Sequence, residues 1–212
     1  MSESLNSPKT AVRAGLRSAR KSLPTGARRA ADEALVRALI DLVLAMSARI
    51  VACYFPRPGE PGGAGLVDGI AGAGPRVLLP VLLDDLDLDW AEYDGRLRPG
   101  RYGLSEPVGT ALGVAAIGEV DLVVAPGLAV DRAGVRLGQG GGSYDRALAR
   151  TDAPVLVPLY PGERVDELPA DPHDRRVTAA LVGYESPHLY WTKATPMPHH
   201  WHSKYRSAND GG

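Results

Sequence analysis

Five short runs of consecutive apolar residues constrain the fold of this chain most strongly. They span residues 49–55, 76–83, 120–125, 154–157 and 177–182, and together they are rich in valine and leucine. Segments with helical spacing of apolar residues lie between several of them. Strands that are apolar on both faces are typical of parallel sheets that helices cover on both sides. The sequence therefore predicts an α/β fold, with a mostly parallel sheet flanked by helices on both faces in a Rossmann-like three-layer arrangement.

Two helices are predicted before the first apolar run. The first spans residues 8–22 and opens with Ser7 and Pro8, a suitable N-cap and first-turn proline. The second covers about residues 26–46, where leucines recur at helical spacing. Residues 88–93 alternate between apolar and polar side chains, which predicts an added hairpin strand. We therefore expect an N-terminal helical pair followed by the sheet.

The length of 212 residues fits one domain. We expect residues 1–186 to form a single α/β catalytic domain and residues 187–212 to form a polar C-terminal tail outside the core. The tail contains His199, His200 and His202. Without a cysteine or carboxylate partner nearby, we interpret these histidines as part of a polar segment rather than as a transition-metal site.

Composition excludes several classes of protein. Cys53 is the only cysteine, which excludes an internal disulfide and a cysteine-based zinc cluster and favours a reduced, cytoplasmic setting with Cys53 in the core. No apolar run reaches the roughly 18 residues of a membrane span. The formal net charge of −1 argues against non-specific nucleic-acid binding. We therefore expect small-molecule substrates, no nucleic-acid or membrane partner, and a monomer or weak homodimer.

The balanced total charge conceals a basic N-terminus, with seven basic residues and one acidic residue among the first 30. Four of these cations form a stripe along the first predicted helix: Lys9, Arg13, Arg17 and Arg20. The stripe lies beside the apolar stripe of that helix rather than opposite it. Two interpretations remain open, a solvated basic face and a row of cations that looks into a cleft. For Arg17 and Arg20 we expect surface or helix-pairing roles.

A glycine-rich loop carries the clearest chemical signal. Four of the five residues 138–142 are glycine, and the loop lies between the apolar run at 120–125 and a helical pattern through Arg150. Such a loop lets backbone N–H groups approach a phosphate, and a following helix N-terminus adds partial positive charge. No lysine stands where a P-loop requires one, and Ser143 breaks a dinucleotide fingerprint. Asp145 can either hold Mg²⁺ on a bound polyphosphate or cap the following helix.

Residues 126–131 together with 136–146 closely resemble the signature of the 5-formyltetrahydrofolate cyclo-ligase family, also called methenyltetrahydrofolate synthetases. Weaker matches follow in the family's order over about residues 8–183. They comprise Lys9 with Arg13, Tyr54-Phe55 followed by Glu60, the run 101–107, and the run 167–174. The resemblance implies ATP-dependent conversion of 5-formyltetrahydrofolate to 5,10-methenyltetrahydrofolate, with release of ADP and phosphate, through phosphorylation of the formyl oxygen and ring closure by N10.

The resemblance also implies roles for individual residues. The catalytic residues would be Arg136, Tyr144 and Asp145, and Mg²⁺ would be held by Asp145 and Asp174. The folate would contact Phe55 and Glu60 and the middle of the loop, Gln139, Gly140, Gly141, Gly142 and Ser143. ATP would contact Lys9, Arg13, Arg136, Leu137, Gly138, Gln139, Gly140, Gly141, Gly142, Ser143 and Tyr144.

The chain departs from the family at two positions that bear on catalysis. Ser143 stands where the family usually has a second aromatic residue, and Thr178 stands where it often has an aspartate. The alternative interpretation is therefore a diverged or non-catalytic nucleotide- or phosphate-binding module of the same fold. A dinucleotide-dependent oxidoreductase is disfavoured by the broken glycine fingerprint.

Overall fold

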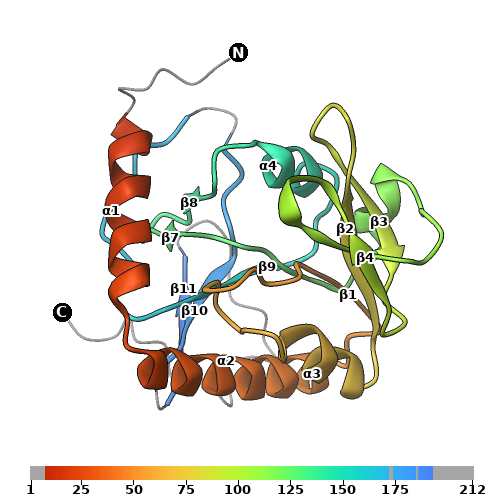
Figure 1. The fold of residues 1–212 in the computed structure, drawn as a ribbon, viewed down its shortest axis with the longest axis horizontal. Helices are drawn as coiled ribbons and strands as arrows, with labels where there is room; N and C mark the ends of the chain where they lie inside the picture. Colours follow the sequence, from red (N-terminus) through yellow and green to blue (C-terminus); the bar gives the residue numbers. More distant parts are fainter. Residues whose placement is uncertain (1–7, 172–173, 185, 193–212) are drawn as a thin grey trace.

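The computed structural model describes residues 8–171, 174–184 and 186–192, which form a layered α/β structure (Figure 1). Its centre is a seven-stranded sheet in the order β11-β10-β9-β6-β1-β2-β3. The five inner strands are parallel, and each outer strand is antiparallel to its neighbour. The predicted mostly parallel sheet is thus confirmed. The strands are β1 Ile50–Cys53, β2 Arg76–Leu82, β3 Leu88–Glu92, β6 Leu122–Val124, β9 Val155–Leu159, β10 Ala179–Val182 and β11 His188–Trp191.

The predicted apolar runs all contain strands, and most of these strands are shorter than the runs. In β6 every residue is buried, as in β9 and β10. Asp121, which precedes β6, lies outside it, and its carboxylate accepts hydrogen bonds from the N–H groups of Arg49 and Ile50 at 2.7 and 2.9 Å. This side chain therefore fixes the start of β1 against the start of β6.

Helices cover both faces of the sheet, as predicted. Figure 1 shows α2 (Thr25–Ala45) and α3 (Leu66–Gly72) along one face and α4 (Ser143–Leu148) on the other, where the 3₁₀ segment η2 (Val114–Glu119) also lies. Leu35 and Leu39 of α2 share a core with Val51, whereas Leu148 of α4 shares a second core with Val123. None of the helices in the described part of the chain has the length and apolar character needed to span a bilayer.

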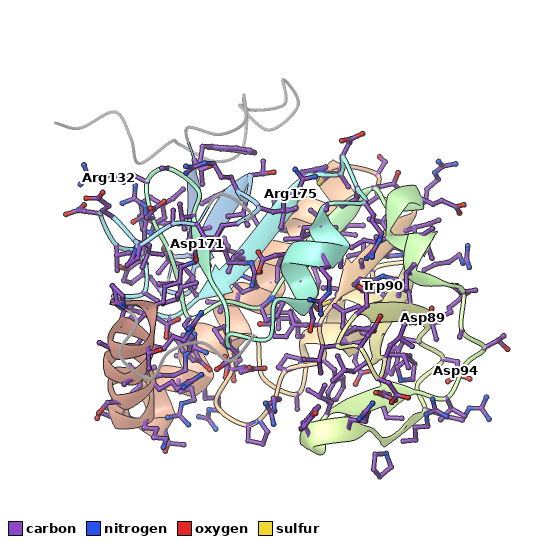
Figure 2. The ribbon with its side chains drawn as sticks, turned by 90° about the horizontal axis from the view of Figure 1, so that it is seen from above. Asp89, Trp90, Asp94, Arg132, Asp171 and Arg175 are labelled. Carbon is purple, nitrogen blue, oxygen red and sulfur yellow. The ribbon has the colours of Figure 1, made fainter. Side chains whose placement is uncertain are left out.

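The predictions for the two edge strands of the sheet had different outcomes. The hairpin strand expected at residues 88–93 is β3, in which Trp90, labelled with Asp89 in Figure 2, is fully buried. The tail boundary at residue 187 is wrong, because β11 joins the sheet and buries Leu189 and Trp191. In β11 the buried Leu189 and Trp191 alternate with His188 and Tyr190. The latter two make the segment look polar in the sequence. The three histidines at 199–202 lie outside the described residues.

The first predicted helix is α1 (Pro8–Ser22), and its cap residue Ser7 lies outside the described residues. Val12 and Leu16 pack on a small hairpin of β7 (Ala129–Val130) and β8 (Arg136–Leu137). In Figure 1 this helix stands at one end of the sheet, beside β7 and β8. A second small sheet joins β4 (Leu97–Pro99) to β5 (Ser105–Pro107), with the 3₁₀ turn η1 (Arg101–Gly103) between them.

A buried ion pair anchors α1 to the rest of the molecule. Arg20 donates two hydrogen bonds to the carboxylate of Glu163, both at 2.7 Å, and one to the carbonyl oxygen of Gly127 at 2.9 Å. The side chains of Arg20 and Glu163 are 8% and 6% exposed. The predicted surface role of Arg20 is therefore wrong. Its partners follow β6 and β9, so this contact joins α1 to two central strands.

Replacing Arg20 with alanine should destabilise the protein by about 3–5 kcal/mol, because Glu163 would be left buried and without its cation. Chemical denaturation measures this loss. Arg29→Ala is the matched control, since Arg29 pairs with Glu33 at 3.8 Å on the exposed face of α2 and should change stability little. Equal effects of the two substitutions would contradict the anchoring role of Arg20.

Candidate active site

The sheet topology places a cavity at the carboxyl ends of the parallel strands. From β1 the chain moves to β2 on one side, and the later strands β6, β9 and β10 are added on the other side. Ligands of open α/β sheets bind where the strand order reverses in this way. Here Phe55 follows β1, and Pro126 and Gly127 follow β6; all three line a cavity of about 930 Å³.

Every residue that the sequence assigned to a site lines this one cavity, although the residues come from distant parts of the chain. They are Lys9, Arg13, Phe55, Glu60, Arg136, Leu137, Gly138, Gln139, Gly140, Gly141, Gly142, Ser143, Tyr144, Asp145 and Asp174. The structure thus brings the predicted residues together. For two of the four cations in the basic stripe, Lys9 and Arg13, it favours the interpretation in which they look into a cleft.

Lys9 closes one side of the cavity through two carboxylates. Its Nζ lies 2.6 Å from Asp171 Oδ2 and 2.7 Å from Asp174 Oδ2. Burial opposes the charge on Lys9, but the hydrogen bonds to these two carboxylates outweigh burial and raise the pKa of the ammonium group. Lys9 is therefore a charged group at the cavity wall, and Asp171 is a neighbour that sequence reasoning missed.

Arg13 and Arg17 bind the glycine loop itself. Arg13 Nε donates to the carbonyl oxygen of Gly138 at 3.0 Å, and Arg17 donates to the side-chain oxygen of Gln139 at 2.7 Å. Arg17 also donates to the backbone carbonyl oxygen of Gln139 at 3.3 Å. The backbone of the loop is therefore held against α1 at both Gly138 and Gln139. The expected surface role of Arg17 is only partly right, since this exposed side chain also contacts the loop.

The glycine loop has backbone geometry that suits glycine. Gly140 and Gly142 have φ values of 107° and 70°, in the region that other residues rarely adopt. Helix α4 begins directly after Gly142 but has only six residues and ends at Leu148, short of the predicted end near Arg150. Its aligned peptide dipoles are few, so the loop N–H groups and the nearby cations carry more of the attraction for an anion.

Arg136 lies almost completely buried at the centre of the cavity wall. Its Nη1 donates to the carbonyl oxygen of Pro126 and its Nη2 pairs with Asp145 Oδ1, both at 3.0 Å. Its guanidinium lies 5.7 Å from the ring centre of Tyr144. Arg136 Nε and the Tyr144 hydroxyl are buried polar groups with no hydrogen-bond partner in the described part of the chain. Buried polar groups of this kind are normally satisfied by a protein group, a water molecule or a ligand.

Tyr144 is a proton donor rather than a base in this setting. Burial raises the pKa of its hydroxyl well above the usual value, so the phenol stays neutral at physiological pH. Burial likewise raises the pKa of the Cys53 thiol, which confirms the predicted core position of this residue and leaves it unreactive. Tyr144 therefore meets the cavity as a neutral phenol, and Cys53 is not among the residues that line it.

The opposite end of the cavity is apolar. Phe55 is joined there by Pro80 and Leu82 from β2, Leu88 from β3, and Leu104. Sequence reasoning missed the last four. The strands β2 and β3 bring Pro80, Leu82 and Leu88 to the cavity, and Leu104 lies just before β5, which contacts β2. Glu60 is the carboxylate at this end, and its Oε2 accepts the N–H of Arg57 at 2.9 Å.

The structure supports the Glu60 loop from behind. Tyr160 places its hydroxyl 3.1 Å from the carbonyl oxygen of Glu60 and 2.9 Å from Asp32 Oδ1. Asp32 Oδ1 also accepts the N–H of Gly62 at 2.8 Å. Since Asp32 belongs to α2, the carboxylate of Glu60 is carried by a loop that the helical layer holds in place.

Comparison with known proteins identifies the family. The model of the 5-formyltetrahydrofolate cyclo-ligase family matches residues 6–183. The chain belongs to this family.

Among curated cyclo-ligases of the family, the protein from Mycolicibacterium smegmatis is 41% identical over 182 residues, covering 82% of this chain and 93% of that protein. The protein from Haemophilus influenzae is 28% identical and covers 81% of this chain and 96% of its own length. The solved structure of 5,10-methenyltetrahydrofolate synthetase from Aquifex aeolicus superposes with a TM-score of 0.75 at 25% identity, over 93% of this chain and 99% of that chain. The three-layer fold and the N-terminal helices agree with this neighbour.

The cyclo-ligase match spans the sheet from β1 to β10 together with every predicted site residue. It ends at residue 183, so β11 lies beyond it. Of the two positions at which the chain departs from the family pattern, only Ser143 lines the cavity. Thr178 is buried beside β9, where its hydroxyl accepts the N–H of Val155 at 2.9 Å. The threonine therefore has a structural role at the start of a strand.

Proposed function

We propose that this protein converts 5-formyltetrahydrofolate to 5,10-methenyltetrahydrofolate at the expense of ATP. The observation that carries the proposal is a single cavity with a cationic, glycine-lined end and an apolar end that bears a carboxylate. Membership of the cyclo-ligase family supplies the reaction class. The cavity's two ends match the two substrates, a polyphosphate and a reduced pterin.

The triphosphate of ATP fits the cationic end. Lys9, Arg13 and Arg136 supply full positive charges around the glycine loop, whose N–H groups can donate to phosphate oxygens. In the described structure Lys9 is paired with Asp171 and Asp174. We propose that Lys9 exchanges part of this pairing for phosphate oxygens when ATP binds.

The pterin of the folate fits the apolar end. Phe55 and the leucines of β2 and β3 offer apolar surface to a planar ring. The carboxylate of Glu60 can accept N–H donors of the ring in a bidentate manner, since each carboxylate oxygen has two lone pairs. Gln139 to Ser143 lie between the two ends and would contact both substrates.

Magnesium is the cofactor we propose. Mg²⁺ typically takes one or two carboxylates together with substrate phosphates and water. In the described residues no three or more histidine, cysteine, aspartate or glutamate side chains gather as a metal site of their own. Asp145 and Asp174 both line the cavity, and this small donor set fits Mg²⁺ that arrives with ATP. When bound, the ion would neutralise charge on the phosphates.

The chemistry requires alignment and charge neutralisation. The formyl oxygen attacks the γ-phosphorus, and ADP leaves. N10 then attacks the activated formyl carbon, and the bond from carbon to the original formyl oxygen breaks as phosphate departs. Arg136 can stabilise charge on the phosphoryl group in transfer, and the neutral Tyr144 hydroxyl can donate to an oxygen beside it. No step uses a protein nucleophile.

Mixing the protein with Mg-ATP and 5-formyltetrahydrofolate should release ADP and produce the near-ultraviolet absorbance of a methenylfolate. A spectrophotometer follows the product while a coupled assay follows ADP. Arg136→Ala should lower turnover by at least about a hundredfold, the scale seen when a charge-stabilising group is removed. Folded protein that binds ATP without turnover would instead favour the non-catalytic module.

Asp145→Asn should raise the Mg²⁺ concentration needed for half-maximal activity by about tenfold, because one of the one or two carboxylates expected to bind the ion is lost. The asparagine keeps an oxygen for Arg136, so the variant tests the charge rather than that hydrogen bond. Asp152→Asn, on the exposed loop after α4, serves as the control and should leave the requirement unchanged. An unaltered Mg²⁺ requirement in Asp145→Asn would exclude Asp145 as a ligand.

A further inference from the structure

The turn between β2 and β3 reaches the cavity through one side chain, that of Leu86. Leu86 has a φ of 65°, and the described chain contains only two other non-glycine residues with positive φ, Ser47 and Tyr102. A bulky residue rarely adopts this conformation unless its surroundings impose it. The turn thus fixes Leu86 in a backbone conformation that leucine does not favour.

Hydrogen bonds within the turn account for part of this conformation. The N–H of Leu86 donates to the carbonyl oxygen of Leu83 at 3.1 Å, and the N–H of Leu83 donates to that of Asp87 at 2.9 Å. The carboxylate of Asp85 accepts the N–H of Asp87 at 2.9 Å. The five residues 83–87 therefore form a closed turn with Leu86 near its end.

Three cations outside the turn contact it. Arg101 pairs with Asp84, and the other two follow the glycine loop. Arg146 of α4 donates to the carbonyl oxygen of Leu86 at 2.5 Å. Arg150, just beyond α4, binds the carboxylate of Asp87 with both terminal nitrogens, at 3.0 and 2.5 Å. The hydrogen bonds from Arg150 lower the pKa of Asp87, so this pair stays charged at neutral pH. A bidentate pair of this kind fixes direction as well as distance.

The same short helix therefore borders both ends of the cavity. Its first residue, Ser143, follows the glycine loop, its last turn carries Arg146, and Arg150 lies two residues beyond its end. Figure 1 shows α4 and that turn side by side above the sheet. Leu86 thereby joins Leu82, Leu88 and Leu104 among the leucines that line the cavity together with Phe55.

We propose that Leu86 is a specificity-determining residue that packs against the pterin ring, and that Arg146 and Arg150 are positioning residues that hold it there. This inference rests on the proposed function, because it assigns the pterin to the apolar end. An aliphatic side chain fixed against a planar ring adds apolar contact without a hydrogen bond. A turn tied to α4 keeps this contact at a constant distance from the glycine loop.

Leu86→Gly separates this role from a structural one. Glycine removes the apolar contact and relieves the positive φ, so the protein should keep or gain thermal stability while its Kd for 5-formyltetrahydrofolate rises about tenfold. Calorimetry should find the Kd for Mg-ATP changed by less than about twofold, since the proposal places Leu86 against the pterin and not against the nucleotide. Ser47→Gly is the matched control, because it relieves a φ of 51° just after α2, at a residue that does not line the cavity, and should leave both Kd values unchanged.

The positioning residue Arg150 is tested in the same binding experiment. Arg150→Ala should raise the Kd for 5-formyltetrahydrofolate by several fold. Arg150→Lys should recover only part of the affinity, because it keeps the charge opposite Asp87 but loses the bidentate contact. Arg76→Ala, which breaks the exposed pair with Glu92 on the same strand pair, should change neither Kd. An unchanged Kd for the folate in Leu86→Gly, or an equal loss of affinity for Mg-ATP, would overturn the proposal.

The binding readout keeps this proposal distinct from the proposed function. Wild-type protein that binds 5-formyltetrahydrofolate without turnover would refute the catalytic function, while the Kd values of the Leu86 and Arg150 variants would still decide the role of the turn. Wild-type protein that does not bind the folate would refute both.

Discussion

The buried pair of Arg20 and Glu163 is the contact on which the cationic end of the cavity depends. Arg20 belongs to α1, whereas Glu163 follows β9 and also accepts the N–H of Tyr160 at 2.8 Å. Lys9, Arg13 and Arg17 share the helical stripe of Arg20, because residues three and four positions apart lie on one face. Once the pair fixes α1, its other cations meet the glycine loop and the two aspartates beside it.

The sheet supplies the second constraint, because its topology brings both ends of the cavity to one edge of the sheet. β1 and β6 are neighbours, so the segments after them, with Phe55 and Pro126, enter the cavity together. α4 continues the segment after β6 and contacts the turn between β2 and β3. Charged and apolar surfaces that are distant in the chain thus become parts of one site, as the proposed reaction between a polyphosphate and a folate requires.

Local pattern was sufficient to predict much of this structure. Apolar runs predicted the strands because a buried parallel strand is apolar on both faces. The glycine loop lies at the cavity, and its use as a phosphate site stays a prediction. The burial of Arg20 could not be foreseen, since its partner lies 143 residues away. Leu86 was missed for a similar reason, because only the pairing of β2 with β3 and the position of α4 bring it to the cavity. β11 was taken for tail because polar neighbours mask its alternating pattern.

The fate of the formyl oxygen tests the central claim most directly. If ATP activates this oxygen by phosphorylation, 5-formyltetrahydrofolate that carries a heavy oxygen isotope in its formyl group should transfer that isotope to the inorganic phosphate released. Mass spectrometry of the phosphate measures the transfer. The account predicts one heavy oxygen in each phosphate formed. Heavy oxygen that appears in water, with unlabelled phosphate, would contradict it.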